Sequence, residues 1–263
     1  RGVTRGGIRT CLMVPQLDLM FDVGGPVRGQ LKFGTILVSH GHQDHLGDLP
    51  YLLSQRQLAG LPPPTVHVPR EIDDPLRRII AAWGEIEGFT LGIELVPHDP
   101  GDVVALARGV TATCFRTTHR VPSLAWLVTR TSGRLRPEYV GKSGPELAEL
   151  RKQGVHVTEP HEVDLLCVTG DTQIELFLAE PRVRACKVLV HEITAWDERR
   201  TVDETRAWGH THVDELIAVA ERFDGDALVL VHRSPRHTWT QAAEVVRTRF
   251  PAAVRDKVHV FGR

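Results

Sequence analysis

His40-Gly41-His42-Gln43-Asp44-His45 is the stretch that decides the fold, because it places metal-ligating side chains directly behind a short apolar segment. The preceding residues 35–39, Thr-Ile-Leu-Val-Ser, predict a buried strand. A loop leaving this strand can turn its first two histidines toward one metal ion while Asp44 and His45 face a second. Imidazole and carboxylate groups suit zinc, with manganese or iron as alternatives. The motif therefore predicts a two-metal hydrolytic site, with two zinc ions as the expected cofactors.

Two metal ions need more ligands than this motif supplies. The carboxyl ends of neighbouring strands meet at one edge of a sheet, so further ligands should follow other predicted strands. His119, Asp171 and His232 each lie at or just after the end of such a strand. An isolated histidine is more often a surface or core residue, but four clusters at strand ends indicate a metal centre.

The composition limits the class of protein. The chain of 263 residues is 41% hydrophobic and 25% charged, which is ordinary for a globular protein with a substantial core. Its formal net charge is −1, so any contact with nucleic acid must be local. No stretch approaches the length of a membrane span, and we expect no membrane contact. The four cysteines are separated and are expected to be buried, reduced thiols of a cytoplasmic protein: Cys11, Cys114, Cys167 and Cys186.

Strand patterns dominate the first half of the chain, and strands alternate with helices in the second. Two mixed sheets packed together with helices outside, an α/β (α+β) arrangement in one domain spanning 1–263, would satisfy this order. Capping-box patterns begin at Thr211 and Thr238. Strands are expected at 10–14, 17–23, 35–39, 65–68, 91–96, 103–106, 109–117, 124–129, 164–169, 187–191, 227–231 and 257–261. Helices are expected at 46–59, 74–87, 145–153, 173–179, 213–223 and 241–250.

The order of the candidate ligands resembles that of the metallo-β-lactamase superfamily, whose fold is an αββα sandwich. The shared pattern is His-x-His-x-Asp-His, a lone His, Gly170-Asp171-Thr172 and a final His. The resemblance implies that the Asp171 carboxylate bridges two zinc ions. It assigns His40, His42, His119 and Asp171 to one ion, and Asp44, His45, Asp171 and His232 to the other.

Three further segments resemble ribonuclease Z in its short, plant-type form, which removes 3′ trailers from precursor tRNA. They are His191-Glu192-Ile-Thr-Ala, Gly209-His210-Thr211-His212 and His232-Arg-Ser-Pro-Arg236. In that family, the pair matching Glu192 and His210 protonates the leaving oxygen, and Asp44 would orient or deprotonate the attacking water. The alternative is that Glu192 and His210 are merely a strand-end residue and a helix-cap residue.

The sequence also departs from the family. Ala195 and His237 replace the usual aromatic residue and tyrosine, and the 52 positions from His119 to Asp171 predict a short tRNA-gripping arm at 130–160. Residues 130–152 carry six basic side chains against three acidic ones, which suits a phosphate backbone, although a solvated surface would look the same. The candidate substrate contacts are Arg134, Arg136 and Lys142 in the arm, with Arg236 and Arg56 elsewhere.

Two other functions remain open at this point. A hydrolase of a small phosphodiester, sulfate ester, lactone or thioester would fit the neutral chain and the short arm. A non-catalytic tRNA-binding subunit is a third reading, but the presence of every ligand opposes it. The resemblance further implies precursor tRNA as the partner and a homodimer as the assembly.

Overall fold

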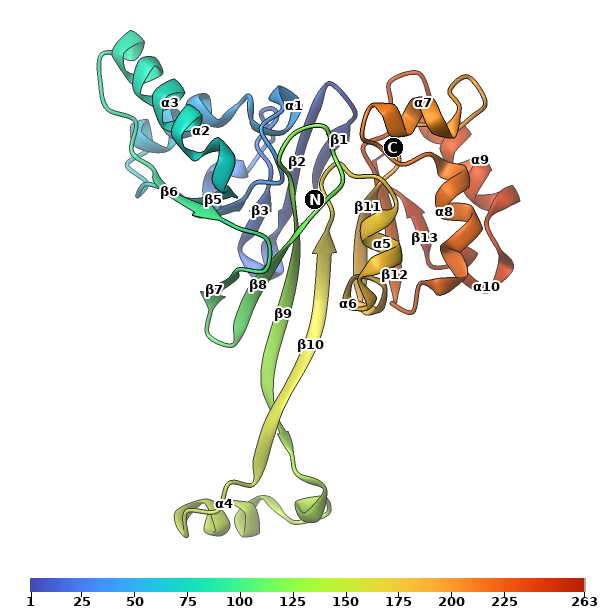
Figure 1. Ribbon diagram of the computed structural model, residues 1–263. Coiled ribbons are helices and arrows are strands. Elements are labelled where there is room, and N and C mark those ends of the chain that lie inside the picture. Colours follow the sequence, from blue (N-terminus) through green and yellow to red (C-terminus); the bar gives the residue numbers. More distant parts are fainter. Residues whose placement is uncertain (263) are drawn as a thin grey trace.

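A computed structural model describes residues 1–262 and contains two β-sheets packed face to face between helices (Figure 1). This is the αββα sandwich expected from the sequence. The first sheet contains, in spatial and chain order, β1 (Gly2–Arg5), β2 (Arg9–Val14), β3 (Leu19–Phe21), β4 (Thr35–Leu37), β5 (Thr65–Pro69) and β6 (Glu94–His98). The second contains, in spatial order, β13 (Val258–Val260), β12 (Ala227–Val231), β11 (Val188–Glu192), β10 (Thr158–Val168), β9 (Leu124–Leu135), β8 (Val110–Arg116) and β7 (Val103–Ala107).

The helices cover the outer faces of both sheets and also occupy the tip of an extended arm. The longest of them, α3, has 15 residues, and no helix within residues 1–262 is long and apolar enough to cross a membrane. The helices are α1 (Gln43–Leu46), α2 (Leu49–Leu58), α3 (Asp73–Glu87), α4 (Gly144–Lys152), α5 (Glu175–Ala179), α6 (Pro181–Ala185), α7 (Val202–Ala207), α8 (Val213–Val219), α9 (Trp239–Arg249) and α10 (Ala252–Arg255).

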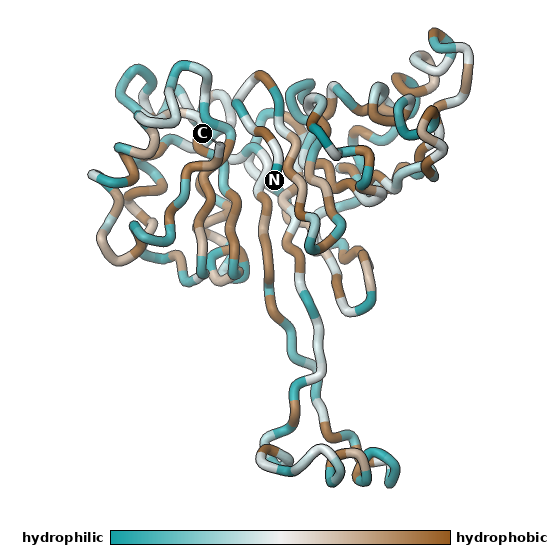
Figure 2. Tube along the Cα trace, turned by 180° about the vertical axis from the view of Figure 1, so that it is seen from behind, coloured by the Kyte–Doolittle hydropathy of each residue, from teal (hydrophilic) through white to brown (hydrophobic). Residues whose placement is uncertain are grey.

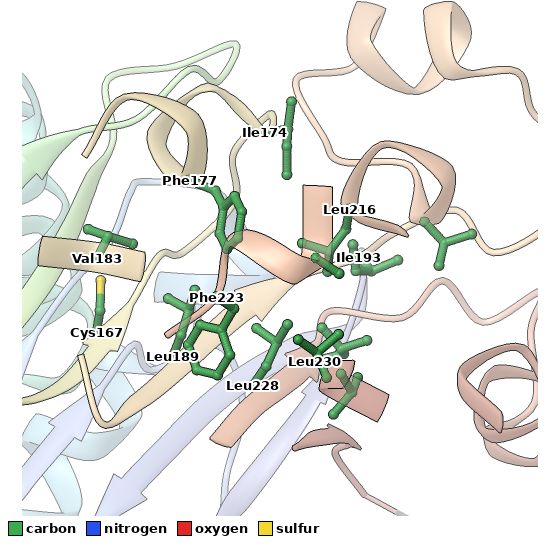
Figure 3. Close-up of a cluster of buried hydrophobic side chains, with 14 of the residues drawn as sticks. Cys167, Ile174, Phe177, Val183, Leu189, Ile193, Leu216, Phe223, Leu228 and Leu230 are labelled. Carbon is green, nitrogen blue, oxygen red and sulfur yellow. The ribbon is translucent and has the colours of Figure 1, made fainter. Parts of the chain in front are cut away.

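Three hydrophobic clusters fill the three spaces between the four layers. Successive strand residues point to opposite faces, so each strand serves two clusters. In β4, Ile36 packs toward α2 and α3 while Leu37 packs between the sheets. In β11, Leu189 packs under α5 and α8, as Figure 3 shows, while Val190 faces the other sheet. The near-continuous apolar runs in the sequence follow from this burial on both faces.

The second sheet continues into an arm. Strand β9 is buried up to Thr129 and largely exposed from Arg130 to its end, and it pairs with β10 over six further positions, Arg130–Leu135 against Thr158–Val163. At about 3.3 Å per residue this ribbon extends roughly 20 Å beyond the sandwich. Figure 1 shows it projecting from the body with α4 at its tip, and Figure 2 shows its strands becoming largely hydrophilic as they leave the body.

Helix α8, which precedes β12, begins one residue later than its capping pattern predicts. His212, not Thr211, is the N-cap of α8: the amide of Asp214 donates to its imidazole, and the Glu215 side chain accepts from the His212 amide. Thr211 instead donates through its hydroxyl to the carbonyl of Thr172, beside the site. The capping box at Thr238 is confirmed.

Candidate metal centre

The His40–His45 segment lies where β4 ends and α1 begins. His40 forms an isolated bridge with Ser123, which ties the segment to the second sheet just before β9. His42 is the residue before α1, and Asp44 and His45 belong to its single turn. The strand–loop–helix turn therefore separates the histidines of the loop from the two ligating side chains of the helix.

The first group of candidate ligands combines this loop with two other strand ends. His40, His42, His119 and Asp171 each offer one ligand atom, and these atoms all lie within 4.8 Å of one another. His42 Nδ1 lies 3.0 Å from His40 Nε2 and 3.2 Å from His119 Nε2, while Asp171 Oδ2 is 3.7 Å from His40 Nε2. Three nitrogens and one oxygen thus converge, as a zinc-binding group requires.

The second group consists of Asp44, His45 and His232. Asp44 Oδ2 lies 3.3 Å from His232 Nε2 and 3.7 Å from His45 Nε2. Asp171 reaches this group as well, with Oδ1 at 3.3 Å from His45 Nε2 and Oδ2 at 3.3 Å from His232 Nε2. The structure therefore brings together all seven side chains predicted as ligands and places Asp171 between the two groups, where a bridging carboxylate would lie.

Hydrogen bonds from the surrounding chain orient four of the histidines. Each uses Nδ1 for this bond, which leaves Nε2 facing the cluster. His45 Nδ1–H donates to Asp22 at 2.8 Å, and His119 Nδ1–H donates to the Gly209 carbonyl at 2.8 Å. The hydroxyls of Ser39 and Thr194 lie 3.0 Å from Nδ1 of His40 and His232, respectively.

The chemistry of these donors fits bound cations. His45 Nε2 and Asp171 Oδ1 are buried and lie 3.3 Å apart, but within residues 1–262 neither has a partner with hydrogen-bond geometry, which is uncommon for buried polar atoms. Burial would raise the pKa of the Asp171 carboxyl, but His232 and His45 hold it well below its usual range. Burial lowers the pKa of His40 and His119, so both rings are neutral and able to ligate. Burial would lower the pKa of His45, but Asp171 and Asp22 raise it well above its usual range, so a cation at this position would replace the proton on the ring.

Glu192 and His210 form a hydrogen-bonded pair beside this centre. Glu192 is fully buried at the end of β11, and its Oε1 accepts from His210 Nδ1 at 2.9 Å and from the Thr172 and Thr211 amides at 3.2 Å each. Burial alone would lower the pKa of His210, but the Glu192 carboxylate offsets this and raises the pKa to about 9. His210 stacks on His232 with ring centroids 5.3 Å apart. It is therefore protonated at neutral pH and lies next to the ligands.

His210 also has a competing role. Asp171, His210 and His232 form a third group whose ligand atoms lie within 4.8 Å of one another. His210 could then ligate a cation rather than supply a proton. The Nδ1 atom of His210 is engaged by Glu192, which favours the acid role. Metal content in a His210 variant distinguishes the two roles.

Sequence reasoning missed the residues that support the ligands. Asp22 follows β3 and binds His45 Nδ1, and its other carboxylate oxygen accepts the Ser39 amide at 2.7 Å. Asp22 and His232 both adopt the left-handed backbone conformation, each with φ of 59°, which costs about 1–3 kcal/mol in a non-glycine residue. A lone aspartate directly after a short apolar strand was the available signal. Thr194 gave none, because its contact depends on how β11 and β12 pair.

A cavity of about 400 Å³ opens from His210 and His232 toward the surface. Arg236 lines its rim, as a substrate contact would require. The prediction for Arg56 is wrong. Arg56 is 3% exposed, and its guanidinium donates to the carbonyls of Leu31, Phe33 and Pro62, so it stabilises loops beneath α2 and is not available to a phosphate. Arg134, Arg136 and Lys142 belong to the arm, outside this cavity.

Comparison with known sequences agrees with this arrangement. Residues 20–233 match the model of the beta-lactamase superfamily domain. The chain is 31% identical to tRNase Z TRZ1 from Arabidopsis thaliana over 247 residues, covering 93% of this chain and 88% of that protein. It is also 31% identical to the chloroplastic tRNase Z TRZ2 of the same plant, with coverage of 93% and 70%.

Solved structures support the fold. The metallo-beta-lactamase fold protein YhfI from Bacillus subtilis superimposes with a TM-score of 0.66 at 14% identity, covering 98% of this chain and 92% of that one. The short form of human tRNase Z superimposes with a TM-score of 0.60 at 18% identity, covering 98% and 93%. At these identities the likeness concerns the fold alone. On the sequence match across most of its length, the chain belongs to the tRNase Z family of the beta-lactamase superfamily.

Proposed function

We propose that this protein is a binuclear zinc endonuclease that removes the 3′ trailer from precursor tRNA. The observation that carries the proposal is the buried Glu192–His210 pair beside the seven candidate ligands, with Oε1 and Nδ1 2.9 Å apart. Cleavage of a phosphodiester expels a poor alkoxide leaving group, and an imidazolium held by a carboxylate can protonate it. The family to which the chain belongs includes proteins named tRNase Z, which supports tRNA as the substrate.

The residues divide the reaction between them. When bound, a pair of zinc ions polarises the phosphate oxygens and acidifies water. Asp44 orients the attacking water, because the Gly7 amide fixes its Oδ2 at 2.8 Å and His232 helps to keep its pKa low, which makes it a poor proton acceptor. The water loses one proton to solvent, and its oxygen forms a bond to phosphorus as the bond to O3′ breaks. His210 donates its proton to O3′, leaving a 3′-hydroxyl on the tRNA and a 5′-phosphate on the trailer.

The position of the arm favours a large substrate over a small ester. Figure 1 shows α1, which carries two candidate ligands, at one end of the body. The arm projects from the opposite end of the body and has α4 at its tip. A small phosphodiester in the cavity cannot contact both regions, whereas a folded RNA can. The arm carries Arg134, Arg136 and Lys142 on a chain of net charge −1, so this segment can provide the local positive charge that a polyanion requires.

Replacing Arg134, Arg136 and Lys142 together by glutamine should raise KM for precursor tRNA and flatten its dependence on salt. Each phosphate contact that is lost removes about one unit from the slope of log affinity against log salt, so the slope should fall by up to about three. Steady-state kinetics between 50 and 200 mM salt would measure both quantities. A chromogenic phosphodiester, which is too small to reach the arm, should be hydrolysed at the wild-type rate.

An equal loss on both substrates would indicate a folding defect in the variant. An unchanged KM for precursor tRNA would place the recognition surface outside the arm. A wild-type protein that hydrolyses the chromogenic ester but ignores precursor tRNA would overturn the proposed substrate and favour a small-ester hydrolase. As a control, Arg247→Gln changes an exposed arginine that is paired with Glu244 on α9, and it should leave the tRNA kinetics unchanged.

We further propose that the protein forms a homodimer through α2 and α3. Ile79 and Ile86 lie two turns apart on α3 and are 55% and 75% exposed, while Tyr51 and Leu58 have the same spacing on α2 and are 51% and 73% exposed. Such apolar stripes on neighbouring helices are typical of an interface. Light scattering should give the mass of a dimer for the wild-type protein and of a monomer for Ile79→Glu/Ile86→Glu. A wild-type monomer would contradict the proposal.

The cysteines support a cytoplasmic location. All four are free and buried, as expected for thiols in a reducing compartment. We propose the cytoplasm on this basis, and recovery of the tagged protein in another cell fraction would contradict it.

A further inference from the structure

Trp208 is an exposed aromatic side chain at the mouth of the cavity that contains His210. It is 52% exposed, and it lines the cavity together with Arg200, Arg236 and the two histidines His210 and His232. Leaving a tryptophan half exposed forgoes much of the stabilisation that its burial would give. Its side chain is therefore available to a ligand that enters the cavity.

The backbone holds this tryptophan in a fixed relation to the metal centre. Trp208 directly follows α7, and the chain turns at Gly209, whose φ is +79°. The Gly209 carbonyl accepts the Nδ1–H of His119, and a Cβ at Gly209 would lie 2.7 Å from that same nitrogen. The turn therefore presses the Trp208 segment directly against a candidate metal ligand, and a larger residue at position 209 would push it away.

Two arginines lie over the indole ring. The guanidinium carbon of Arg120 is 4.7 Å from the ring centroid of Trp208, and that of Arg200 is 6.0 Å away. Within residues 1–262 neither guanidinium forms a hydrogen bond or an ion pair, so both charges remain available to an anion. Unpaired bases stack on aromatic rings and on guanidinium planes, and guanidinium groups also bind phosphate. A half-exposed indole with two unneutralised arginines over it therefore suits an unpaired nucleotide whose base displaces a guanidinium from the ring and whose phosphates bind the arginines.

We propose that Trp208 is a stacking platform for the base of the nucleotide immediately 5′ to the cleaved phosphate, with Arg120 and Arg200 binding the adjacent backbone. This rests on the proposed function, because His210 identifies the side of the leaving oxygen. His210 protonates O3′, and O3′ belongs to the nucleotide on the 5′ side. That nucleotide must extend from His210, and Trp208 lies two residues away along the same cavity wall. The cavity of about 400 Å³ is within the range of small-ligand sites.

Substrates lacking a single base test this assignment. The wild-type protein should lose roughly 10- to 100-fold in kcat/KM when the nucleotide 5′ to the scissile phosphate is abasic, the range typical of one base–aromatic stack. Trp208→Ala should show a similar loss on the intact substrate and less than about a twofold further loss on the abasic one. Trp208→Tyr, which keeps an aromatic face, should retain most of the wild-type value. On a substrate whose abasic residue lies one position 3′ to the cut, the wild-type and Trp208→Ala proteins should still differ in kcat/KM.

A matched pair of arginine variants tests the flanking charges. Arg120→Gln should lower kcat/KM for precursor tRNA. Arg116→Gln removes an exposed arginine that lies four residues earlier and is paired with Glu71. This control variant should keep the wild-type kcat/KM for precursor tRNA. Additive losses for Trp208→Ala and the 5′ abasic substrate would overturn the proposal, because the side chain and the base would then act independently.

A binding measurement separates this proposal from the proposed function. In equilibrium dialysis of the metal-loaded protein, Trp208→Ala should weaken the binding of adenosine 3′-monophosphate at least tenfold and leave that of ribose 3-phosphate unchanged. Equal affinities of the wild-type and Trp208→Ala proteins for adenosine 3′-monophosphate would overturn the platform, whatever the cleavage assay gives. A protein that binds the nucleotide through Trp208 but does not cleave precursor tRNA would overturn the proposed function and leave the platform standing.

Discussion

Replacing His210 by alanine is expected to lower the turnover of precursor tRNA by about two to four orders of magnitude, the usual contribution of general acid catalysis. The imidazolium is held by Glu192 and lies beside the candidate ligands, so its loss leaves the leaving oxygen without a proton donor. Metal content should remain at the wild-type value, as elemental analysis would show. Loss of metal in this variant would instead make His210 a ligand and the assignment of the acid wrong.

The pH dependence provides a second test of the same residue. The pKa of His210 is raised to about 9, so its acid form persists through neutral pH and is lost as the pH rises through that value. Cations bound to Asp171 would lower this pKa, because positive charge disfavours the protonated imidazole. The wild-type kcat should therefore fall on the alkaline side, at or below about pH 9, and His210→Ala should lack this limb. An alkaline limb that persists in the variant would assign it to another group.

Replacing Asp171 by asparagine should have an effect of comparable or larger size. Asp171 lies 3.3 Å from both His45 and His232 and contributes to both groups of ligands, so removal of its charge weakens both positions. We expect about two equivalents of metal per wild-type chain and at most about one in the variant, with turnover reduced roughly a thousandfold or more. Elemental analysis of zinc-supplemented protein measures this directly.

A surface aspartate provides the control for this variant. Asp99→Asn removes an exposed carboxylate that is paired with Arg70, and it should leave metal content unchanged. A wild-type protein that binds no metal under zinc supplementation would contradict the metal centre itself. An Asp171→Asn protein that retains two equivalents would contradict the bridging role.

The fold and the candidate ligands could be predicted because their signals are local. The motif from His40 to His45 follows β4 of the first sheet, and the lone ligands His119, Asp171 and His232 follow β8, β10 and β12 of the second. Each ligand could be found as a polar residue at the end of a strand, and the structure brings these side chains together. The supporting residues could not be predicted in this way. Thr194 contacts His232 across 38 positions, and Gly209 contacts His119 across 90, so these contacts depend on tertiary packing.

The arm shows why the ends of strands are predicted poorly in exposed segments. Sequence patterns end the strands at residue 129 and begin them again at 164, whereas β9 continues to Leu135 and β10 begins at Thr158. The added positions face solvent on both sides, so they lack the apolar alternation that indicates a strand. The prediction for Arg56 was wrong because an arginine is usually exposed, whereas this one is buried. The three carbonyls that accept its hydrogen bonds are remote in sequence or belong to loops, so the local sequence gives no sign of the burial.

The central claim is most directly tested by mapping the ends of the products from a precursor tRNA that carries a 3′ trailer. Incubation with the zinc-loaded protein should give a tRNA ending in a 3′-hydroxyl and a trailer beginning with a 5′-phosphate, and a chelator should prevent both. This result follows from attack by water on phosphorus with O3′ leaving under protonation by His210. A tRNA product ending in a 3′-phosphate, or cleavage that persists without metal, would contradict the account.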